Sequence, residues 1–204
     1  HSRWSLPTLI GSRSSPPRKL QYFTGFLPIK QFDFSKDSQR TPKHSTGGGV
    51  PVWTPQEGVQ SLAYACDADQ IGYGGAAGGG KSDLLIGMAG TKHRRAIIFR
   101  RVFPSLRGMI ERSREIFNAS DAAHGKDSYN EQLHVWRLGS KQMLEFGSVQ
   151  YDQDLKKYQG QPHDLLGIDE ATEFSEKIVR FLMGWNRTTV PGQACKLVLT
   201  FNPP

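Results

Sequence analysis

The chain has 204 residues, of which 37% are hydrophobic, 22 are glycine and 12 are proline, and its net charge at pH 7 is +7. This length suits one domain with its own core, and the composition is typical of an α/β domain with long loops. The positive charge favours an anionic partner, most commonly nucleic acid, and a solvated basic surface without a partner is the alternative.

The sequence has no sign of a membrane-spanning or secreted protein. No apolar run approaches the length of a membrane span, and no signal peptide is visible. The two cysteines, Cys66 and Cys195, lie far apart in apolar surroundings and have no CxxC spacing. We therefore expect an intracellular protein without a membrane partner, in which both cysteines are reduced core residues.

The first 52 residues are rich in Ser, Pro, Gly, Lys and Arg and have no sustained hydrophobic period. Two apolar patches, 20–23 and 26–29, interrupt them. We predict a basic, poorly ordered N-terminal arm over 1–52 that is ordered only where these patches dock. Its charges could contact DNA or a neighbouring subunit, or could be solvated. Because the chain starts with His1 and stops just after an apparent strand, we expect a fragment of a larger protein.

The globular part is predicted to span 53–204 and to start with a helix. Thr54 can cap this helix with Pro55 at its first position, and the helix would run to Cys66. Gln56 and Gln60 stand where an amide could read an adenine edge, since an amide offers both a donor and an acceptor. An ordinary exposed helix glutamine is the alternative for each.

The next segment fits the phosphate-binding pattern G-x-x-x-x-G-K-[ST]. It lies between a short apolar strand, 70–73, and an apolar helix from 84 onward, which is the order that phosphate binding needs. Glycines allow the backbone to turn its N–H groups inward, Lys81 would reach the β- and γ-phosphates, and Ser82 would ligate Mg²⁺. We predict that this loop binds a nucleoside triphosphate through Gly75, Ala76, Ala77, Gly78, Gly79, Gly80, Lys81 and Ser82.

Beyond this loop, 96–99 reads as a buried strand of a parallel sheet. Arg100 and Arg101 follow at its carboxyl end, where ligands of open α/β sheets bind. Ser105 is predicted to open an amphipathic helix, which a polar loop over 118–130 follows. Two strands, 133–136 and 142–146, then flank a hairpin turn at 139–140.

The second chemical signature is the apolar strand 165–168 followed by Asp169 and Glu170, a Walker B pattern. Asp169 would hold Mg²⁺, directly or through water, from the tip of a strand beside the phosphate loop. Glu170 would position and activate the attacking water, which favours hydrolysis over transfer to a second substrate.

The last predicted elements are a helix over 175–185 and a buried strand over 196–201. Thr200 and Asn202 lie at the end of this strand, where a polar pair could sense the γ-phosphate. Capping of the strand end is the alternative interpretation of both residues.

Taken together, these segments resemble the ATPase domain of the large terminase subunit, the motor that packages DNA into the heads of tailed bacteriophages. The likeness covers the chain from about Trp53 to Pro204 in family order. It is carried by 73–83 (YGGAAGGGKSD), 98–108 (IFRRVFPSLRG), 111–114 (ERSR), 157–160 (KYQG), 168–174 (IDEATEF) and 199–203 (LTFNP).

The resemblance implies an ASCE-type P-loop NTPase: a mainly parallel sheet flanked by helices, binding ATP and Mg²⁺, with Asp83 among the nucleotide-binding residues. It also implies translocation of double-stranded DNA by a homo-oligomeric ring, usually a pentamer, with the portal protein and the small terminase subunit as partners. The protein would act in the host cytoplasm and transiently at the portal vertex of a procapsid. Thr200 and Asn202 would belong to the motif that couples hydrolysis to movement, and Gln60 matches the spacing of the adenine-contacting glutamine better than Gln56.

The chain departs from the family in two ways. Many relatives have a catalytic arginine inside the loop where this chain has Ala77, and others have one before the Walker B strand, where it has 156–159 (KKYQ). Arg100 and Arg101 are therefore the candidates for the cation that joins Lys81 and Glu170 in catalysis. No cluster of metal-binding acids matches the family's nuclease domain, so we expect ATP hydrolysis without DNA cleavage.

Two other functions share part of the pattern. A helicase- or recombinase-like ATPase has both signatures but not the context around Arg100 and at 157–160, and strand separation would favour it. A non-catalytic nucleotide-binding assembly module would bind nucleotide without turnover, and Glu170 argues against it.

Overall fold

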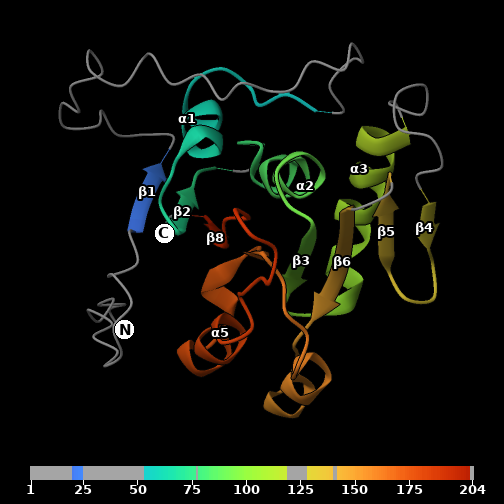
Figure 1. The fold of residues 1–204 in the computed structure, drawn as a ribbon. Coiled ribbons are helices and arrows are strands. Elements are labelled where there is room, and N and C mark those ends of the chain that lie inside the picture. Colours follow the sequence, from blue (N-terminus) through green and yellow to red (C-terminus); the bar gives the residue numbers. More distant parts are fainter. Residues whose placement is uncertain (1–19, 25–52, 77, 119–127, 140–141, 203–204) are drawn as a thin grey trace.

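The computed structural model describes residues 20–24, 53–76, 78–118, 128–139 and 142–202. These residues form one sheet with helices on both faces (Figure 1). The strands are β1 Leu20–Thr24, β2 Gln70–Gly74, β3 Arg95–Arg100, β4 Ser128–Asn130, β5 Val135–Leu138, β6 Gln142–Ser148, β7 Leu165–Ile168 and β8 Lys196–Phe201. The helices are α1 Val59–Ala65, α2 Lys81–Thr91, α3 Arg107–Asn118 and α5 Glu176–Met183, with 3₁₀ turns η1 Phe103–Leu106, η2 Asp152–Tyr158 and η3 Ala171–Glu173.

The strand order is β1-β2-β8-β7-β3-β6-β5-β4. The six strands from β1 to β6 in this order pair in parallel, and only β5 and β4 are antiparallel. The mainly parallel sheet predicted from the sequence is therefore confirmed. Five residues of the predicted arm form the edge strand β1, and the rest of 1–52 lies outside the described residues.

The strand that carries Asp169 is not beside the strand that leads into the phosphate loop. β8 lies between β2 and β7, in register with both. Asp169 at the tip of β7 still lies beside the phosphate loop, as predicted, because its Oδ2 is 3.4 Å from the Ser82 hydroxyl. The sequence patterns made no prediction of strand order, since order depends on long-range pairing and the patterns report only local structure. The carboxyl ends of β2, β8, β7 and β3 nevertheless meet at one edge of the sheet, where ligands of open parallel sheets bind.

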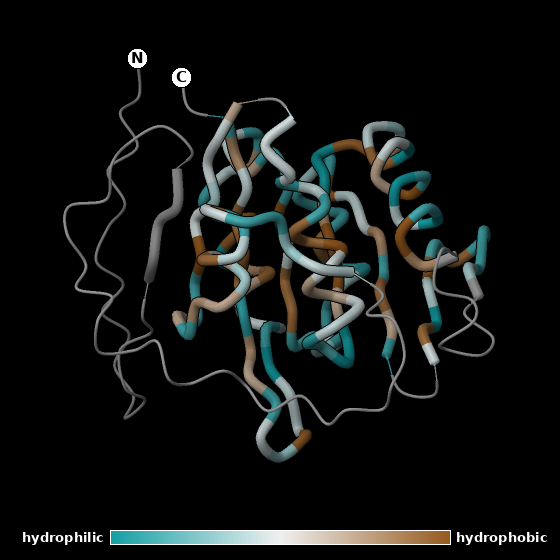
Figure 2. The backbone as a smooth tube through the Cα atoms, turned by 90° about the horizontal axis from the view of Figure 1, so that it is seen from above, coloured by the Kyte–Doolittle hydropathy of each residue, from teal (hydrophilic) through white to brown (hydrophobic). Residues whose placement is uncertain are grey.

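The side chains of β3 alternate between two hydrophobic cores, one on each face of the sheet. Ala96 and Ile98 pack with residues of α1, α2 and α3, while Ile97 and Phe99 pack with residues of η2 and α5. This alternation is the period of two that a strand buried on both faces requires. Hydrophobic stretches concentrate in the central strands and helices, as Figure 2 shows.

Two predicted helix starts were wrong. α1 begins at Val59, not after Thr54, because Gly58 adopts φ 95° and ψ −132°, a conformation that interrupts a helix. α3 begins at Arg107, since Pro104 lies in the preceding 3₁₀ turn. The predicted helix over 175–185 is confirmed as α5, whose cap residue Ser175 accepts a hydrogen bond from the backbone N–H of Ile178 at 3.4 Å.

The predicted hairpin is confirmed by the antiparallel pairing of β5 and β6, although Ser140 of its turn lies outside the described residues. Strand β4 falls within the predicted polar loop and was missed because only three residues pair. Cys66 and Cys195 are half-buried rather than core residues. Within the described part of the chain, no helix is long and apolar enough to cross a membrane.

Candidate active site

The phosphate loop connects β2 to α2 at the carboxyl edge of the sheet. Gly78 and Gly80 have φ values of 82° and 68°, which glycine adopts without strain. The backbone N–H of Gly75 donates to the carbonyl of Phe201 at 3.2 Å, which ties the start of the loop to the end of β8. Residue 77 lies outside the described residues, so the structure does not place the alanine that replaces the family's arginine.

Tyr73 braces this loop from inside the sheet. Its hydroxyl donates to the carbonyl of Gly79 at 3.1 Å, and burial raises the pKa of the phenol above its ordinary value, so that it stays a neutral donor. Sequence reasoning did not single out this residue for the site. The only available signal was its position two residues before Gly75 in a buried strand.

Lys81 is the first residue of α2 and lies at the mouth of the loop. Its ammonium donates to the carbonyls of Gly75 at 2.8 Å and Ala76 at 2.7 Å. These acceptors are neutral, and a phosphate oxygen is a stronger acceptor for an ammonium group. The geometry thus keeps the charge of Lys81 where the predicted phosphates would bind.

The side chain of Asp169 is the point where the candidate site converges. It is 1% exposed and follows β7. Arg100 donates to its Oδ2 through Nε at 2.8 Å and Nη2 at 2.7 Å, and the Ser82 hydroxyl lies 3.4 Å from the same oxygen. The hydroxyl of Thr200 donates to the other oxygen, Oδ1. Side chains from α2, β3 and β8 therefore surround this carboxylate.

Glu170, the next residue, has a different environment. It adopts the left-handed conformation, with φ 56° and ψ 48°, and caps the turn η3. Its side chain is 37% exposed, and Oε1 lies 3.6 Å from Nη2 of Arg100. A non-glycine residue at positive φ costs free energy, and such residues cluster at functional sites. The backbone thus points one carboxylate into the protein and its neighbour toward solvent.

Of the two candidate arginines, the structure brings only Arg100 to the site. Arg101 instead donates to the carbonyl of Val149 beyond the end of β6, at 2.6 Å. The reason is the period of a strand, in which consecutive side chains point to opposite faces. Arg100 also donates to the carbonyl of Ser105 at 2.7 Å, which orients its guanidinium across the edge of the sheet.

The structure places the two glutamines differently from what their spacing suggested. Gln60 is 3% exposed, and both ends of its amide contact backbone: Nε2 donates to Gly80 at 2.9 Å, and Oε1 accepts from the N–H of Gln56 at 2.5 Å. Its amide therefore braces the loop from a buried position. The side chain of Gln56 is exposed beside Gly80, so it is the better placed of the two for an adenine.

Two further predicted residues lie at the border of the site. Asp83 pairs with Arg112 of α3 through two hydrogen bonds of 2.9 and 2.7 Å, so its carboxylate joins two helices rather than the phosphate loop. Asn202 follows β8 and is exposed, while Thr200, two residues earlier, is fully buried against Asp169.

The donor set at Ser82 and Asp169 fits Mg²⁺. Mg²⁺ prefers oxygen ligands, and in phosphate-binding sites it takes one or two from the protein and the rest from water and phosphate. A hydroxyl and a carboxylate from two elements meet here. In the described part of the chain, no group of three or more His, Cys, Asp or Glu could hold a metal by itself.

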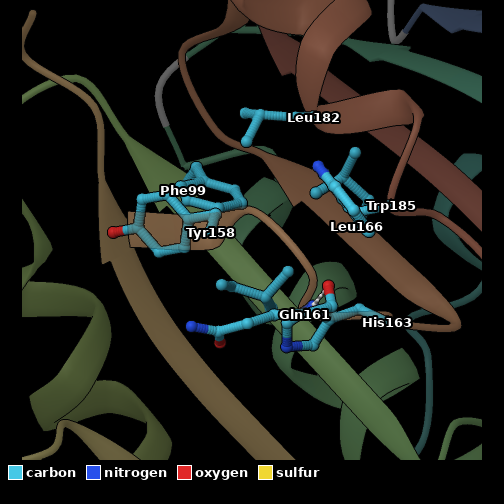
Figure 3. Close-up of a pocket in the computed structure, with 8 residues that line it drawn as sticks. Phe99, Tyr158, Gln161, His163, Leu166, Leu182 and Trp185 are labelled. Carbon is cyan, nitrogen blue, oxygen red and sulfur yellow. Dashed lines mark hydrogen bonds between the residues drawn. The ribbon is translucent and has the colours of Figure 1, made fainter. Parts of the chain in front are cut away.

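A small cavity lies elsewhere, on the face of the sheet that α5 covers (Figure 3). Phe99, Tyr158, His163 and Trp185 are among its lining residues, and none of the predicted site residues is. The Tyr158 hydroxyl donates to the carbonyl of Ser148 at 3.1 Å, which fixes η2 to the end of β6, and burial raises the pKa of this phenol to about 12. We assign this cavity to packing rather than to the candidate site.

No protein-family model and no curated protein matches the sequence. The fold does match solved structures of the large terminase from a thermophilic bacteriophage. One crystal form superposes with a TM-score of 0.55 at 15% sequence identity, covering 71% of this chain and 38% of that chain. The complex with ADP superposes with a TM-score of 0.52 at 14% identity, covering 70% and 37%.

The complex of the same terminase with ATP-gamma-S superposes with a TM-score of 0.50 at 15% identity, covering 71% of this chain and 37% of that chain. The match thus spans well under half of the terminase, and at this identity it establishes the fold alone. The described residues have the fold of a part of a large terminase subunit.

Proposed function

We propose that this chain is the ATPase part of a large terminase and hydrolyses ATP to move double-stranded DNA into a procapsid. The observation that carries the proposal is the convergence of Ser82, Thr200 and Arg100 on the buried Asp169, beside the phosphate loop. The likeness in fold to a terminase solved with ATP-gamma-S and with ADP supports it.

In this mechanism the backbone N–H groups of the loop, the N-terminus of α2 and Lys81 bind the β- and γ-phosphates of ATP. Ser82 and Asp169 would hold Mg²⁺, which neutralises phosphate charge when bound. Glu170 orients a water molecule and accepts its proton as the water oxygen bonds to the γ-phosphorus and the bond to the ADP oxygen breaks. Lys81 and Arg100 stabilise the charge of the transition state.

The distribution of arginine charge supports a nucleic-acid partner. Four arginines are paired with carboxylates on helix surfaces, whereas four other exposed arginines have no carboxylate within 4.0 Å among the described residues. The unpaired set can contact phosphates without breaking an ion pair, and phosphate contacts suit a motor that ignores base sequence. This set is Arg94, Arg95, Arg137 and Arg187.

The assembly that the proposal implies is a homo-oligomeric ring, a pentamer on the portal protein, with the small terminase subunit as a further partner. The protein would work in the host cytoplasm and at the portal vertex. Because Arg101 contacts Val149 and Arg100 contacts Asp169, one cation of the site is available in cis, and a neighbouring subunit would supply any second one.

Steady-state ATP hydrolysis over a range of protein concentrations tests the catalytic proposal, with Glu170→Gln as the comparison. We expect nucleotide binding in both proteins and turnover lower by at least about a hundredfold in Glu170→Gln, because its amide cannot accept the proton of water. Specific activity that rises with concentration would show a site completed by a neighbour. Full turnover in Glu170→Gln would contradict the proposal.

Binding of duplex DNA at increasing salt tests the nucleic-acid part. We expect affinity to fall steeply with salt, and the slope to become shallower when Arg94 and Arg95 are both changed to alanine. Arg107→Ala is the matched control, because Arg107 is exposed but lies 3.4 Å from Glu111. A complex that is insensitive to salt would contradict phosphate contacts.

A further inference from the structure

We propose that Arg100 is a latch on the metal-binding carboxylate: it holds Asp169 in the nucleotide-free protein and has to leave Oδ2 before Mg²⁺ binds there. The inference rests on the proposed function, which makes Asp169 a magnesium ligand, and adds a control step before catalysis. It also gives Arg100 a role on the free protein rather than only on the transition state.

The geometry leaves no room on Oδ2 for an additional ligand. Arg100 places two N–H groups on this oxygen, at 2.8 and 2.7 Å, and the hydroxyl of Ser82 adds a third contact at 3.4 Å. A carboxylate oxygen has two lone pairs. The oxygen that faces Ser82, the second expected magnesium ligand, is therefore the one that the guanidinium occupies.

The other oxygen of Asp169, Oδ1, is also occupied, so it offers Mg²⁺ no alternative position. Oδ1 accepts the hydroxyl of Thr200, a residue with no exposed surface. Thr200 is neutral and belongs to the inner strand β8, so its contact fixes the carboxylate without competing electrostatically with a metal. Arg100 is the partner whose side chain can move, because it lies at the end of β3 and is 20% exposed.

Charge makes the two ligands of Oδ2 mutually exclusive. A guanidinium group is a cation in proteins. Asp169 is almost fully buried, so water screens little of the repulsion between this charge and a divalent cation on the same oxygen. Arg100 and Mg²⁺ therefore compete for Asp169.

A second position for the released guanidinium is already present. Nη2 lies 3.6 Å from Oε1 of Glu170, and Nη1 is tethered to the carbonyl of Ser105 at 2.7 Å. A small rotation about this tether moves the charge from Asp169 toward Glu170 and the loop. Loading of the metal would thus place the arginine beside the catalytic base.

The test compares the affinity of fluorescent mant-ADP for the whole chain in Mg²⁺ and in EDTA. ADP is used because it lacks the γ-phosphate, which removes any contact that Arg100 makes there. We expect the ratio of the two affinities to rise about tenfold in Arg100→Gln, because the variant no longer spends most of its time in a state that excludes the metal. Arg100→Lys, which keeps the charge but loses the two-point contact, should give an intermediate rise.

A merely structural role for Arg100 predicts the opposite sign, since a poorly oriented Asp169 would bind Mg²⁺ less well and the ratio would fall. An unchanged or lower ratio in both variants overturns the latch. Thr200→Val is the matched control, because it removes a neutral partner from the other oxygen, and its ratio should not rise. If Arg100→Gln does not fold, Arg100→Lys decides alone, and if the unmodified chain binds no mant-ADP in Mg²⁺, it is the proposed function that fails.

Discussion

The two ends of the sheet hold buried acids in different ways. At the amino end, Asp164 is 1% exposed and accepts the backbone N–H groups of Arg94 at 3.0 Å and Arg95 at 3.2 Å. At the carboxyl end, the equally buried Asp169 is held mainly by the side chains of Arg100 and Thr200. Backbone partners cannot leave without unfolding a strand, whereas side-chain partners can rotate away.

The two ends of the sheet also differ in how firmly a lysine is held. Lys196 is 7% exposed and donates to the carbonyls of Cys66 at 2.7 Å and Ala68 at 2.8 Å, inside the connection between α1 and β2. Lys81 also bonds two carbonyls, but these belong to a glycine-rich loop at the surface. We infer that polar groups at the amino end stabilise the fold and that those at the carboxyl end are exchangeable, and three substitutions test this difference.

The largest effect is expected for Lys81→Ala. Turnover of ATP should fall about 10³-fold, or about 4 kcal/mol in transition-state stabilisation, because one preorganised cation is lost. The thermal midpoint should barely change, since only two surface carbonyls lose a partner. Kinetics and calorimetry on the same preparation check both statements. Lys177→Ala, at an exposed lysine of α5, is the control, and a large loss of stability in Lys81→Ala would contradict the comparison.

A smaller effect of the opposite kind is expected for Asp164→Ala at the other end. The free energy of unfolding should fall by about 3 kcal/mol, because two backbone N–H groups and the buried His93, whose Nδ1 lies 3.3 Å from Oδ1, lose their charged partner. Urea denaturation measures this loss. Asp67→Ala removes an exposed acid and should leave the midpoint in place. Equal midpoints in the two variants would show that Asp164 does not hold this end together.

The smallest effect is expected for Lys196→Met, at about 1 kcal/mol, because two carbonyls lose a donor while an apolar chain fills the space. Its signature is the pH dependence. Burial lowers the pKa of Lys196 below 10.5 in the folded state, so the unfolded chain binds more protons between the two pKa values.

The unfolding free energy of the original chain should therefore rise with pH over the window that ends near 10.5, as the buried charge is removed. In Lys196→Met this rise should be smaller, although Lys92, whose pKa burial also lowers, retains its own share. Urea midpoints at a series of alkaline pH values measure the slope. Identical slopes in the two proteins would mean that Lys196 titrates alike in the folded and unfolded chain.

Local patterns located both chemical signatures at the carboxyl end. The glycine spacing before Lys81 and the acids after β7 are short-range signals, and the structure places both signatures at one edge of the sheet. The strands β2, β3, β7 and β8 were also visible, because parallel strands buried on both faces read as continuous apolar runs.

What the sequence could not predict depends on contacts between distant segments. The insertion of β8 between β2 and β7 is a choice among many pairings of similar apolar strands. The sequence could not tell which of Arg100 and Arg101 faces the site, because this depends on which side chain at the end of β3 points to the face with Asp169. The burial of Gln60 was not predicted either, because it depends on how α1 packs against the loop. The helix predicted from Thr54 onward begins only at Val59, because the conformation of Gly58 interrupts it.

Because of its position in the sheet, the single strand β8 aligns the phosphate loop and Asp169 with each other. Its Phe201 carbonyl accepts the N–H of Gly75, and its Thr200 hydroxyl donates to Asp169, so consecutive residues touch the start of the loop and the acid after β7. A slip of β8 by a single residue would turn Thr200 to the opposite face and release both contacts together. A shift of β8 would therefore disturb the phosphate loop and the carboxylate of Asp169 together.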